Sequence, residues 1–137
     1  MHERRTKRSD IPEEAARLFL QALVGRHGFE AVVLANEDGL LMAGVGNPDD
    51  ALDLAWIAAL GCVCAIRGRR GPSLGGLVER ATGGQPLEAA EIVIRGERLY
   101  LAAVCGRGGK GTRADLTTPQ VTAGIERILS RSLPAAA

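Results

Sequence analysis

Aromatic side chains are scarce in this sequence of 137 residues, where they amount to 3% as one Trp, one Tyr and two Phe. Hydrophobic residues still reach 46%, so Ala, Leu, Val and Ile must fill the interior. A chain of this length can form a core as one domain. The formal net charge is only +1. This argues against a dedicated nucleic-acid binder, because such proteins carry a strong positive field.

The sequence also lacks segments that direct a chain into or across a membrane. The amino terminus is charged and has no apolar core of a signal peptide. The uncharged run between Asp53 and Arg67 is shorter than the roughly 20 residues that span a bilayer. The three cysteines, Cys62, Cys64 and Cys105, are odd in number and stand in apolar runs. We therefore expect a cytoplasmic protein without membrane insertion, with buried and unbonded thiols.

The central feature is the stretch 47–68 (NPDDALDLAWIAALGCVCAIRG), which is typical of one long helix. It opens with Asn47 as a cap, a proline in the first helical position, and two aspartates that favour the positive end of the helix dipole. It ends with Arg67 in the last turn and with a glycine that can adopt the left-handed conformation. No charged side chain stands between Asp53 and Arg67.

Helical periodicity divides the apolar residues of this stretch into two faces. The bulky face carries Leu52, Trp56, Ala59, Val63 and Ile66. The small-residue face carries Leu54, Ile57, Ala58, Gly61 and Ala65. A helix that is apolar all round must be covered on both sides. We expect the bulky face to rest on a sheet and the small-residue face, together with Leu77, to form the interface with a second copy. A helix buried within its own fold is the alternative.

Changes of hydrophobic period predict the order helix, hairpin, central helix, three strands and helix in a single domain. The last strand is apolar on both faces and should lie in the interior of the sheet. We expect residues 1–9 to be a mobile basic arm, 10–133 the domain and 134–137 a tail. The first helix is expected at Asp10–Gly25, and the strands of the hairpin at Glu30–Ala35 and Leu40–Ala43. A weak strand is expected at Gly76–Ala81, followed by two strands at Leu87–Arg95 and Arg98–Cys105 that are separated by the turn Gly96-Glu97. The final helix is capped by Thr118 and has the core residues Val121, Ile125, Ile128 and Leu129.

In this order of elements the chain resembles the Roadblock family, the dynein light-chain-like domains that regulate small GTPases. The resemblance covers residues 12–133. It rests on the hairpin VVLANEDGLLMAG, the long apolar helix with two Asp at its start, the meander LEAAEIVIRGERLYLAAVC and the final helix. It implies an α/β fold in which a five-stranded antiparallel sheet lies between the long central helix and the two terminal helices.

The resemblance also implies a homodimer in which the long helices of two subunits pair. In bacterial relatives the dimer binds a small Ras-like GTPase and can promote its hydrolysis without supplying an obvious catalytic residue. We therefore expect a non-enzymatic regulatory or scaffold module without a cofactor. The partner-binding groups available at the flanks of the paired helices are Asp50, Asp53 and Arg67.

The glycine-rich loop that follows the last strand, Gly106–Thr112 (GRGGKGT), departs from the family pattern. A P-loop requires its Lys and hydroxyl residue directly after the last glycine, whereas here a glycine separates Lys110 from the threonine. The cations Arg107, Lys110 and Arg113 could still bind an anion. The alternative function is therefore a profilin-like ligand-sensing or anion-sensing domain that uses the loop 106–113.

Metal and enzyme sites find little support in the sequence. On a helix the side chains of Cys62 and Cys64 point about 160° apart, so they cannot share one tetrahedral ion. Cys105 and His27 form no recognisable ligand spacing. A weak enzyme that uses Cys105 as a nucleophile is a third hypothesis. We expect neither a metal site nor a catalytic residue.

Overall fold

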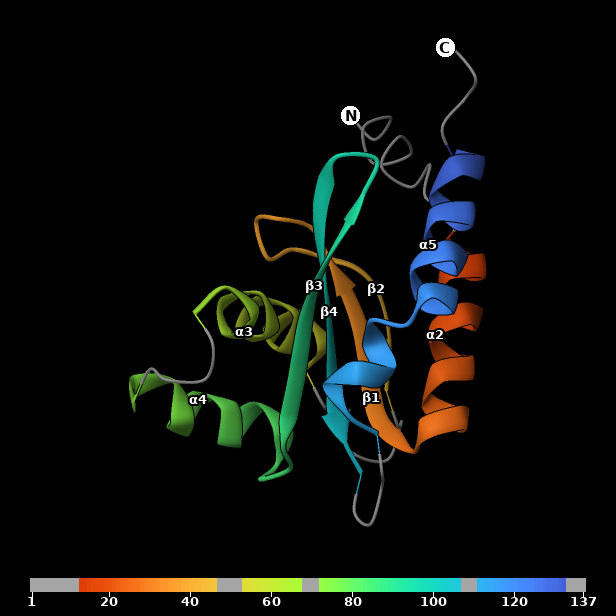
Figure 1. Ribbon diagram of the computed structural model, residues 1–137. Coiled ribbons are helices and arrows are strands. Elements are labelled where there is room, and N and C mark those ends of the chain that lie inside the picture. Colours follow the sequence, from red (N-terminus) through yellow and green to blue (C-terminus); the bar gives the residue numbers. More distant parts are fainter. Residues whose placement is uncertain (1–12, 47–52, 68–71, 107–110, 133–137) are drawn as a thin grey trace, which may run out of the picture.

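The computed structural model describes residues 13–46, 53–67, 72–106 and 111–132. Figure 1 shows an α/β fold with one antiparallel sheet and helices on both of its faces. The elements are α2 (Glu13–His27), β1 (Phe29–Ala35), β2 (Leu41–Gly46), α3 (Leu54–Arg67), α4 (Pro72–Thr82), β3 (Leu87–Ile94), β4 (Glu97–Cys105), the 3-10 turn η1 (Arg113–Leu116) and α5 (Pro119–Ser132).

The four strands of the sheet lie in the order β2-β1-β4-β3. β4 is therefore an interior strand, as its two apolar faces predicted. Helices α2 and α5 cover one face of the sheet, and α3 covers the other with α4 beside it (Figure 1). A core cluster lies on each face. Because both faces are covered, β1 and β4 are buried along almost their whole length.

Local chemistry explains the two hairpins. In the β1–β2 turn, Oδ1 of Asn36 accepts hydrogen bonds from the backbone N–H groups of Asp38 and Leu40, at 2.8 and 3.0 Å. The β3–β4 turn consists of Arg95 and Gly96, with φ angles of 54° and 82°. Two positive φ angles are the mark of a type I′ turn, whose twist matches that of the strands. The expected turn, Gly96-Glu97, was therefore one residue too late.

The helices on the first face follow the predicted apolar stripes. Ala16, Leu20 and Leu23 of α2 are buried against the sheet. At the start of α5, the hydroxyl of Thr118 accepts a hydrogen bond from the N–H of Val121 at 3.2 Å, which confirms the predicted cap. Val121 then packs into the same core cluster as the α2 residues.

Residues 76–81 are helical, and the expectation of a weak strand there is wrong. They belong to α4, which begins with a proline at a position that suits the first helical residue. The apolar residues 77, 78 and 81 have helical spacing and turn towards the core on the α3 side. Gly84 closes the helix by donating its N–H to the carbonyl of Glu79 at 3.0 Å. The sheet therefore has four strands in the part of the chain described, and not the five that were expected.

Helix α3 begins at Leu54, later than the expected start at Asn47. Asp53 is its cap: Oδ1 accepts from the N–H of Trp56 at 3.2 Å, and the backbone carbonyl accepts from Ile57 at 3.0 Å. The capping roles predicted for residues 47–50 lie outside the described residues. So do the predicted arm 1–9 and tail 134–137.

Candidate functional site: the outer face of helix α3

Helix α3 comes closest to the sheet at Gly61. A Cβ atom at Gly61 would overlap the methyl group of Ala102 on β4. Next to Gly61, the side chains of Ile57 and Ala58 have 0% exposure to solvent. The helix backbone therefore approaches the sheet more closely than a larger side chain at position 61 would allow.

This arrangement reverses the expected orientation of α3. The residues assigned to a dimer interface pack inside the subunit instead. Leu54 lies against Gly44 and Gly46 of β2. Ala65 and, on α4, Leu77 are partly buried against the same core cluster as Ile57, Ala58 and the sheet. The physical reason is that the close contact at Gly61 leaves no room for a larger side chain there, so the side of the helix that carries Trp56 and Ile66 faces outward.

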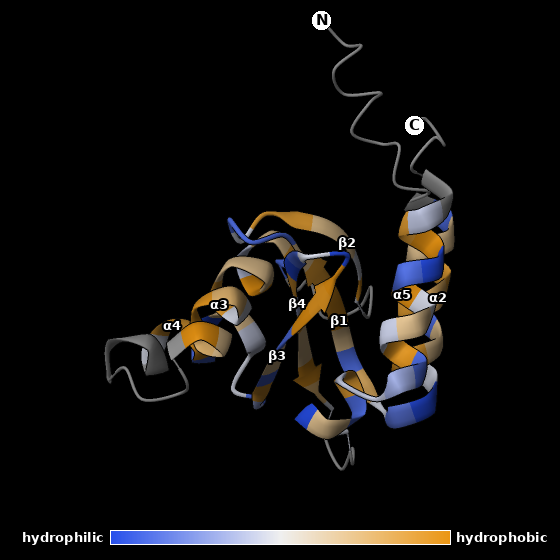
Figure 2. Ribbon diagram, turned by 45° about the horizontal axis from the view of Figure 1, so that its top comes forward, coloured by the Kyte–Doolittle hydropathy of each residue, from blue (hydrophilic) through white to orange (hydrophobic). Residues whose placement is uncertain are grey.

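The bulky residues form what we call the outer face of α3, which is made up of Trp56, Ala59, Val63 and Ile66. Trp56 is 43% exposed and Ile66 is 62% exposed, while the two residues between them are partly exposed. Figure 2 shows that α3 is coloured mainly as hydrophobic although it lies at the surface. Exposed apolar patches of this kind mark interaction sites in soluble proteins. The fifth residue predicted for this face, Leu52, lies outside the described residues.

Further exposed apolar side chains lie on the same side of the sheet. Leu41 of β2 is 39% exposed and lies near Leu54. Val93 of β3 is 57% exposed, and it alternates with residues whose side chains face the opposite core cluster. On the α2 side, by comparison, Leu18 is exposed at 53%. The α3 side is therefore the candidate interaction surface.

Of the three polar residues predicted to bind a partner, Asp53 and Arg67 lie within the described residues. Asp53 is exposed at the amino-terminal end of α3, where it acts as the helix cap. Arg67 is the last residue of α3, at the opposite end of the helix. Asp50 lies outside the described residues. Within the described chain, the predicted residues therefore flank the helix at its two ends and do not form one cluster.

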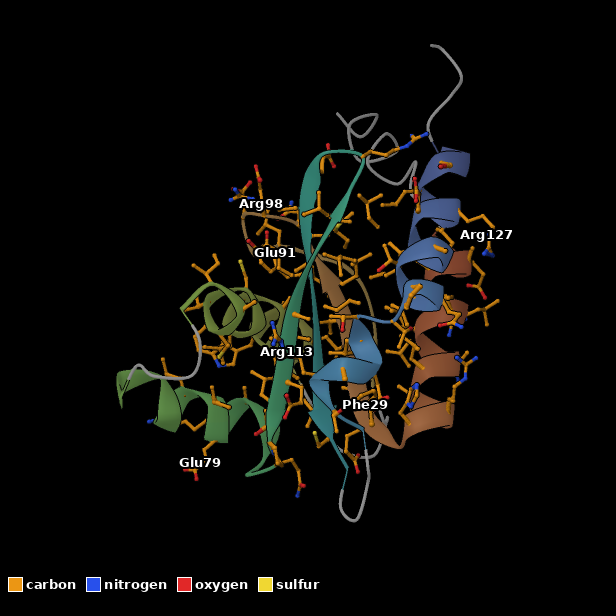
Figure 3. All side chains as sticks on the ribbon, viewed as in Figure 1. Phe29, Glu79, Glu91, Arg98, Arg113 and Arg127 are labelled. Atoms are coloured by element: carbon orange, nitrogen blue, oxygen red, sulfur yellow. The ribbon has the colours of Figure 1, made fainter. Side chains whose placement is uncertain are left out.

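A charged pair lies on the α3 side, near the β3–β4 turn, and sequence reasoning did not single it out. Glu91 and Arg98 approach each other at 3.5 Å between Oε2 and Nε (Figure 3). They come from paired strands, two residues apart in register, a relationship visible only once the hairpin register is known. Tyr100 lies opposite Glu91 and is buried. Burial raises the pKa of the Tyr100 hydroxyl, and the Glu91 carboxylate raises it further.

None of the three cysteines forms a disulfide. Cys62 is buried, and its thiol lies 3.9 Å from the carbonyl oxygen of Glu37, which it can weakly hydrogen-bond. Burial raises the pKa of the Cys62 thiol, and the nearby carboxylates of Asp38 and Glu91 raise it as well. A thiol that stays protonated is a poor nucleophile and a poor metal ligand. The environment of Cys62 therefore suits a packed core residue.

The described part of the loop 106–113 is held against the end of the sheet. Gly111 packs directly on the ring of Phe29, which is labelled in Figure 3. The thiol of Cys105 lies 3.6 Å from the Gly111 carbonyl. Thr112 donates its N–H to Oδ2 of Asp115 at 2.8 Å, which starts η1. These contacts fix where the loop returns to the fold.

The predicted anion-binding cations are not assembled in the described residues. Arg107 and Lys110 lie outside them. Arg113 donates its Nε–H to the backbone carbonyl of Ala89 at 3.0 Å, across the edge of β3. Its guanidinium group is therefore held against a strand rather than presented to the loop, and the ligand-sensing alternative gains no support.

The described ranges contain no group of three or more His, Cys, Asp or Glu side chains that could hold a metal ion. They also contain no helix with the length and apolar character needed to cross a membrane.

No protein-family model matches the chain, and no curated protein matches its sequence. Solved structures do match. MglB of Myxococcus xanthus has a TM-score of 0.55 and 12% identity, over 90% of this chain and 94% of that chain. An MglB with tetrameric arrangement has a TM-score of 0.55 and 16% identity, over 89% of this chain and 93% of that chain. The gliding protein MglB from Thermus thermophilus has the same TM-score and identity, over 87% of this chain and 91% of that chain. The chain has the fold of MglB, which confirms the Roadblock-type fold.

Proposed function

We propose that this chain is a non-enzymatic, homodimeric regulator of a small Ras-like GTPase. Two lines of argument support the proposal. The Roadblock family, which the sequence resembles, regulates small GTPases, and the fold is that of MglB. The second line is the exposed apolar outer face of α3, which is the single observation that carries the proposal of a dimer.

The dimer that we propose pairs the outer faces of two α3 helices about a two-fold axis. Such an axis places the same patch on both subunits, so an apolar patch is covered by its own copy. Trp56 and Ile66 would be its main anchors, because they are the large exposed side chains of the helix. Burial of a large apolar side chain contributes about 1.5–3 kcal/mol before the entropy of association is subtracted.

The GTPase would bind at the flanks of the paired helices, in the cytoplasm. Asp53, at the start of α3, is exposed and can accept hydrogen bonds from a partner in addition to its capping bond. We assign Asp50 and Arg67 to these flanks as well, because Asp50 precedes the start of α3 by four residues in sequence and Arg67 is its last residue. These three residues would orient the partner, while the apolar face holds the two subunits together.

Direct binding tests this function. The probes are the small Ras-like GTPases of the source organism, each loaded with GDP or with a non-hydrolysable GTP analogue, and binding is read by interferometry. We expect one GTPase to bind with a preference for one nucleotide state, and Asp53→Ala to weaken that binding. A matched control is Glu14→Ala, an exposed carboxylate on α2. Absence of binding by every GTPase in both states would overturn the proposal.

A further inference from the structure

Tyr100 of β4 is the only tyrosine of the chain, and it lies almost completely inside the fold. It is 2% exposed and belongs to the core cluster on the α3 side of the sheet. Within the described residues its hydroxyl makes no hydrogen bond. A buried tyrosine usually finds a partner for its hydroxyl, because a polar group that leaves water without a new hydrogen bond is costly. A group from outside the chain can supply the missing bond.

Three elements meet around the end of this side chain. Glu91 of β3 lies directly opposite Tyr100 in the β3–β4 ladder. The β1–β2 turn packs on α3, since a Cβ atom at Gly39 would meet the Cβ of Cys62 at 3.6 Å. The thiol of Cys62 in turn lies 3.9 Å from the carbonyl oxygen of Glu37 in the same turn. The junction is therefore formed by β3, the β1–β2 turn and the middle of α3.

Electrostatic interactions show which charges face the hydroxyl. Burial raises the pKa of Tyr100 most, the Glu91 carboxylate raises it further, and Cys62 and Glu37 act in the same direction. Burial also raises the pKa of Cys62, followed by the carboxylates of Asp38 and Glu91. Because such interactions weaken with distance, the hydroxyl and the thiol lie next to the same negative charges. We call the set of Glu37, Asp38, Glu91 and the Tyr100 hydroxyl the acidic cluster.

The acidic cluster carries more negative charge than its own cation neutralises. Arg98 approaches Glu91 at 3.5 Å, which is long for a hydrogen bond between charged groups. The two side chains are 65% and 39% exposed, on the α3 side of the sheet (Figure 3). Glu37 and Asp38 are exposed and form no ion pair with another described residue. Three carboxylates thus stand beside one loosely held guanidinium group, and a carboxylate can accept several hydrogen bonds.

We propose that the acidic cluster binds a basic side chain of the partner protein, with the cationic nitrogen between the Tyr100 hydroxyl and the Glu91 carboxylate. The hydroxyl oxygen accepts a hydrogen bond from the cation, and the carboxylates of the cluster neutralise its charge. The inference rests on the proposed function. It specifies that the surface of the GTPase which meets this chain presents an arginine or a lysine.

The acidic cluster lies beside the outer face of α3. A Cβ atom at Gly39 would also meet the Cα of Ala59, a residue of that face, at 3.6 Å. A partner bound at the cluster would therefore contact the flank of the paired helices. Asp53, at the start of α3, adds a further exposed carboxylate to the same helix. This negative flank is complementary to a basic surface and unfavourable for an acidic one.

The cluster would also discriminate among partners by charge. A neutral side chain in the same place would leave the carboxylates without a counter-charge in the interface, and an unpaired charge taken out of water is costly. An acidic side chain would be repelled. Specificity of this kind comes from the penalty on the wrong partner as much as from the contact with the right one.

Two conservative variants test the site, and the probe is the small Ras-like GTPase that binds the wild-type chain. Tyr100→Phe removes only the hydroxyl and keeps the ring in the core. Glu91→Gln changes an exposed side chain, so it tests the site independently of any effect of Tyr100→Phe on the fold. Each should weaken binding about tenfold, as expected for the loss of one hydrogen bond to a charged group. The matched control is Glu126→Gln, an exposed carboxylate on α5, which covers the opposite face of the sheet.

Alanine replacement of each exposed Arg and Lys of the GTPase identifies the group that is bound. One of these replacements should weaken binding to the wild-type chain about tenfold and have little effect on binding to the Glu91→Gln chain. A double-mutant cycle reports this difference as a coupling between the two residues. A purely structural role of Glu91 would not produce such a coupling.

Two outcomes would overturn the inference. One is that Tyr100→Phe or Glu91→Gln binds the GTPase as tightly as Glu126→Gln does. The other is that no basic residue of the GTPase is coupled to Glu91. In both cases a GTPase that still binds the wild-type chain leaves the proposed function intact, whereas a chain that binds no GTPase contradicts both.

Discussion

Gly61 of α3 and Ala102 of β4 meet face to face, and the methyl group of Ala102 occupies the space that a side chain at position 61 would need. Gly61→Ala should therefore force the helix away from the sheet. We expect the free energy of unfolding, measured with urea, to fall by about 1–3 kcal/mol, as for other overpacked cores.

A matched control for this variant is Gly76→Ala on α4, where an added Cβ meets no atom within 4 Å. That change should leave stability unaltered or raise it by up to about 1 kcal/mol, because alanine is the better helix former. A Gly61→Ala protein as stable as the wild type would show that α3 does not sit as closely on the sheet as described.

Ala58 offers a second test of how α3 is oriented. It has 0% exposure and lies between the helix and the sheet. Ala58→Arg should cost about 3 kcal/mol or more, because it introduces both excess volume and an unpaired charge into the core. Thermal unfolding followed by circular dichroism should show a large loss of stability. Trp56→Arg, on the outer face, should leave the fold of the subunit intact. Equal melting temperatures for both variants would contradict the orientation.

Stability should fall at high pH. Burial raises the pKa of Cys62 above its ordinary value of 9.0, and that of Tyr100 above its ordinary value of 10.0. The folded state therefore holds both protons more tightly than the unfolded chain. The resulting stabilisation is complete below pH 9 and is lost as the pH rises, because the unfolded chain ionises first. Urea unfolding between about pH 8 and 10.5 should show this decline, and a double variant Cys62→Ala/Tyr100→Phe should show a smaller one. An equal decline in both proteins would refute this origin.

Much of the fold could be predicted because its local signals agree with one another. Asn36 and the glycine at position 39 specify the first hairpin, and Thr118 caps α5 as predicted. The apolar character of β4 on both faces placed it correctly inside the sheet. In each case a short-range pattern and the tertiary contacts favour the same structure.

The orientation of α3 could not be predicted by the same means. The helix is apolar all round, so its periodicity distinguishes no buried side. The side that is buried is decided by the fit of Gly61 against Ala102, a contact between residues 41 positions apart in sequence. The prediction of a strand at residues 76–81 was wrong for a related reason. Its short apolar run suits a strand or a helix equally well, and the contacts that make it helical come from α3.

The candidate site, too, could be predicted from the sequence only in part. Sequence spacing identified Trp56 and Ile66 as neighbours on one helix face, but assigned that face to the core. Arg113 was grouped with loop cations on sequence proximity, while the structure holds it on the backbone of β3. Which residues share a face follows from helical geometry, whereas what covers the face depends on the rest of the fold.

The most direct test of the central claim is sedimentation velocity at micromolar concentration, with wild type, Trp56→Glu/Ile66→Glu and the control Leu18→Glu. All three positions are exposed in the subunit, so each variant should fold. We predict that the wild type and the Leu18→Glu protein are dimers and that the double variant is a monomer, because its carboxylates would be buried against each other at the two-fold axis. A monomeric wild type, or a double variant that remains dimeric, would contradict the proposed role of the outer face of α3.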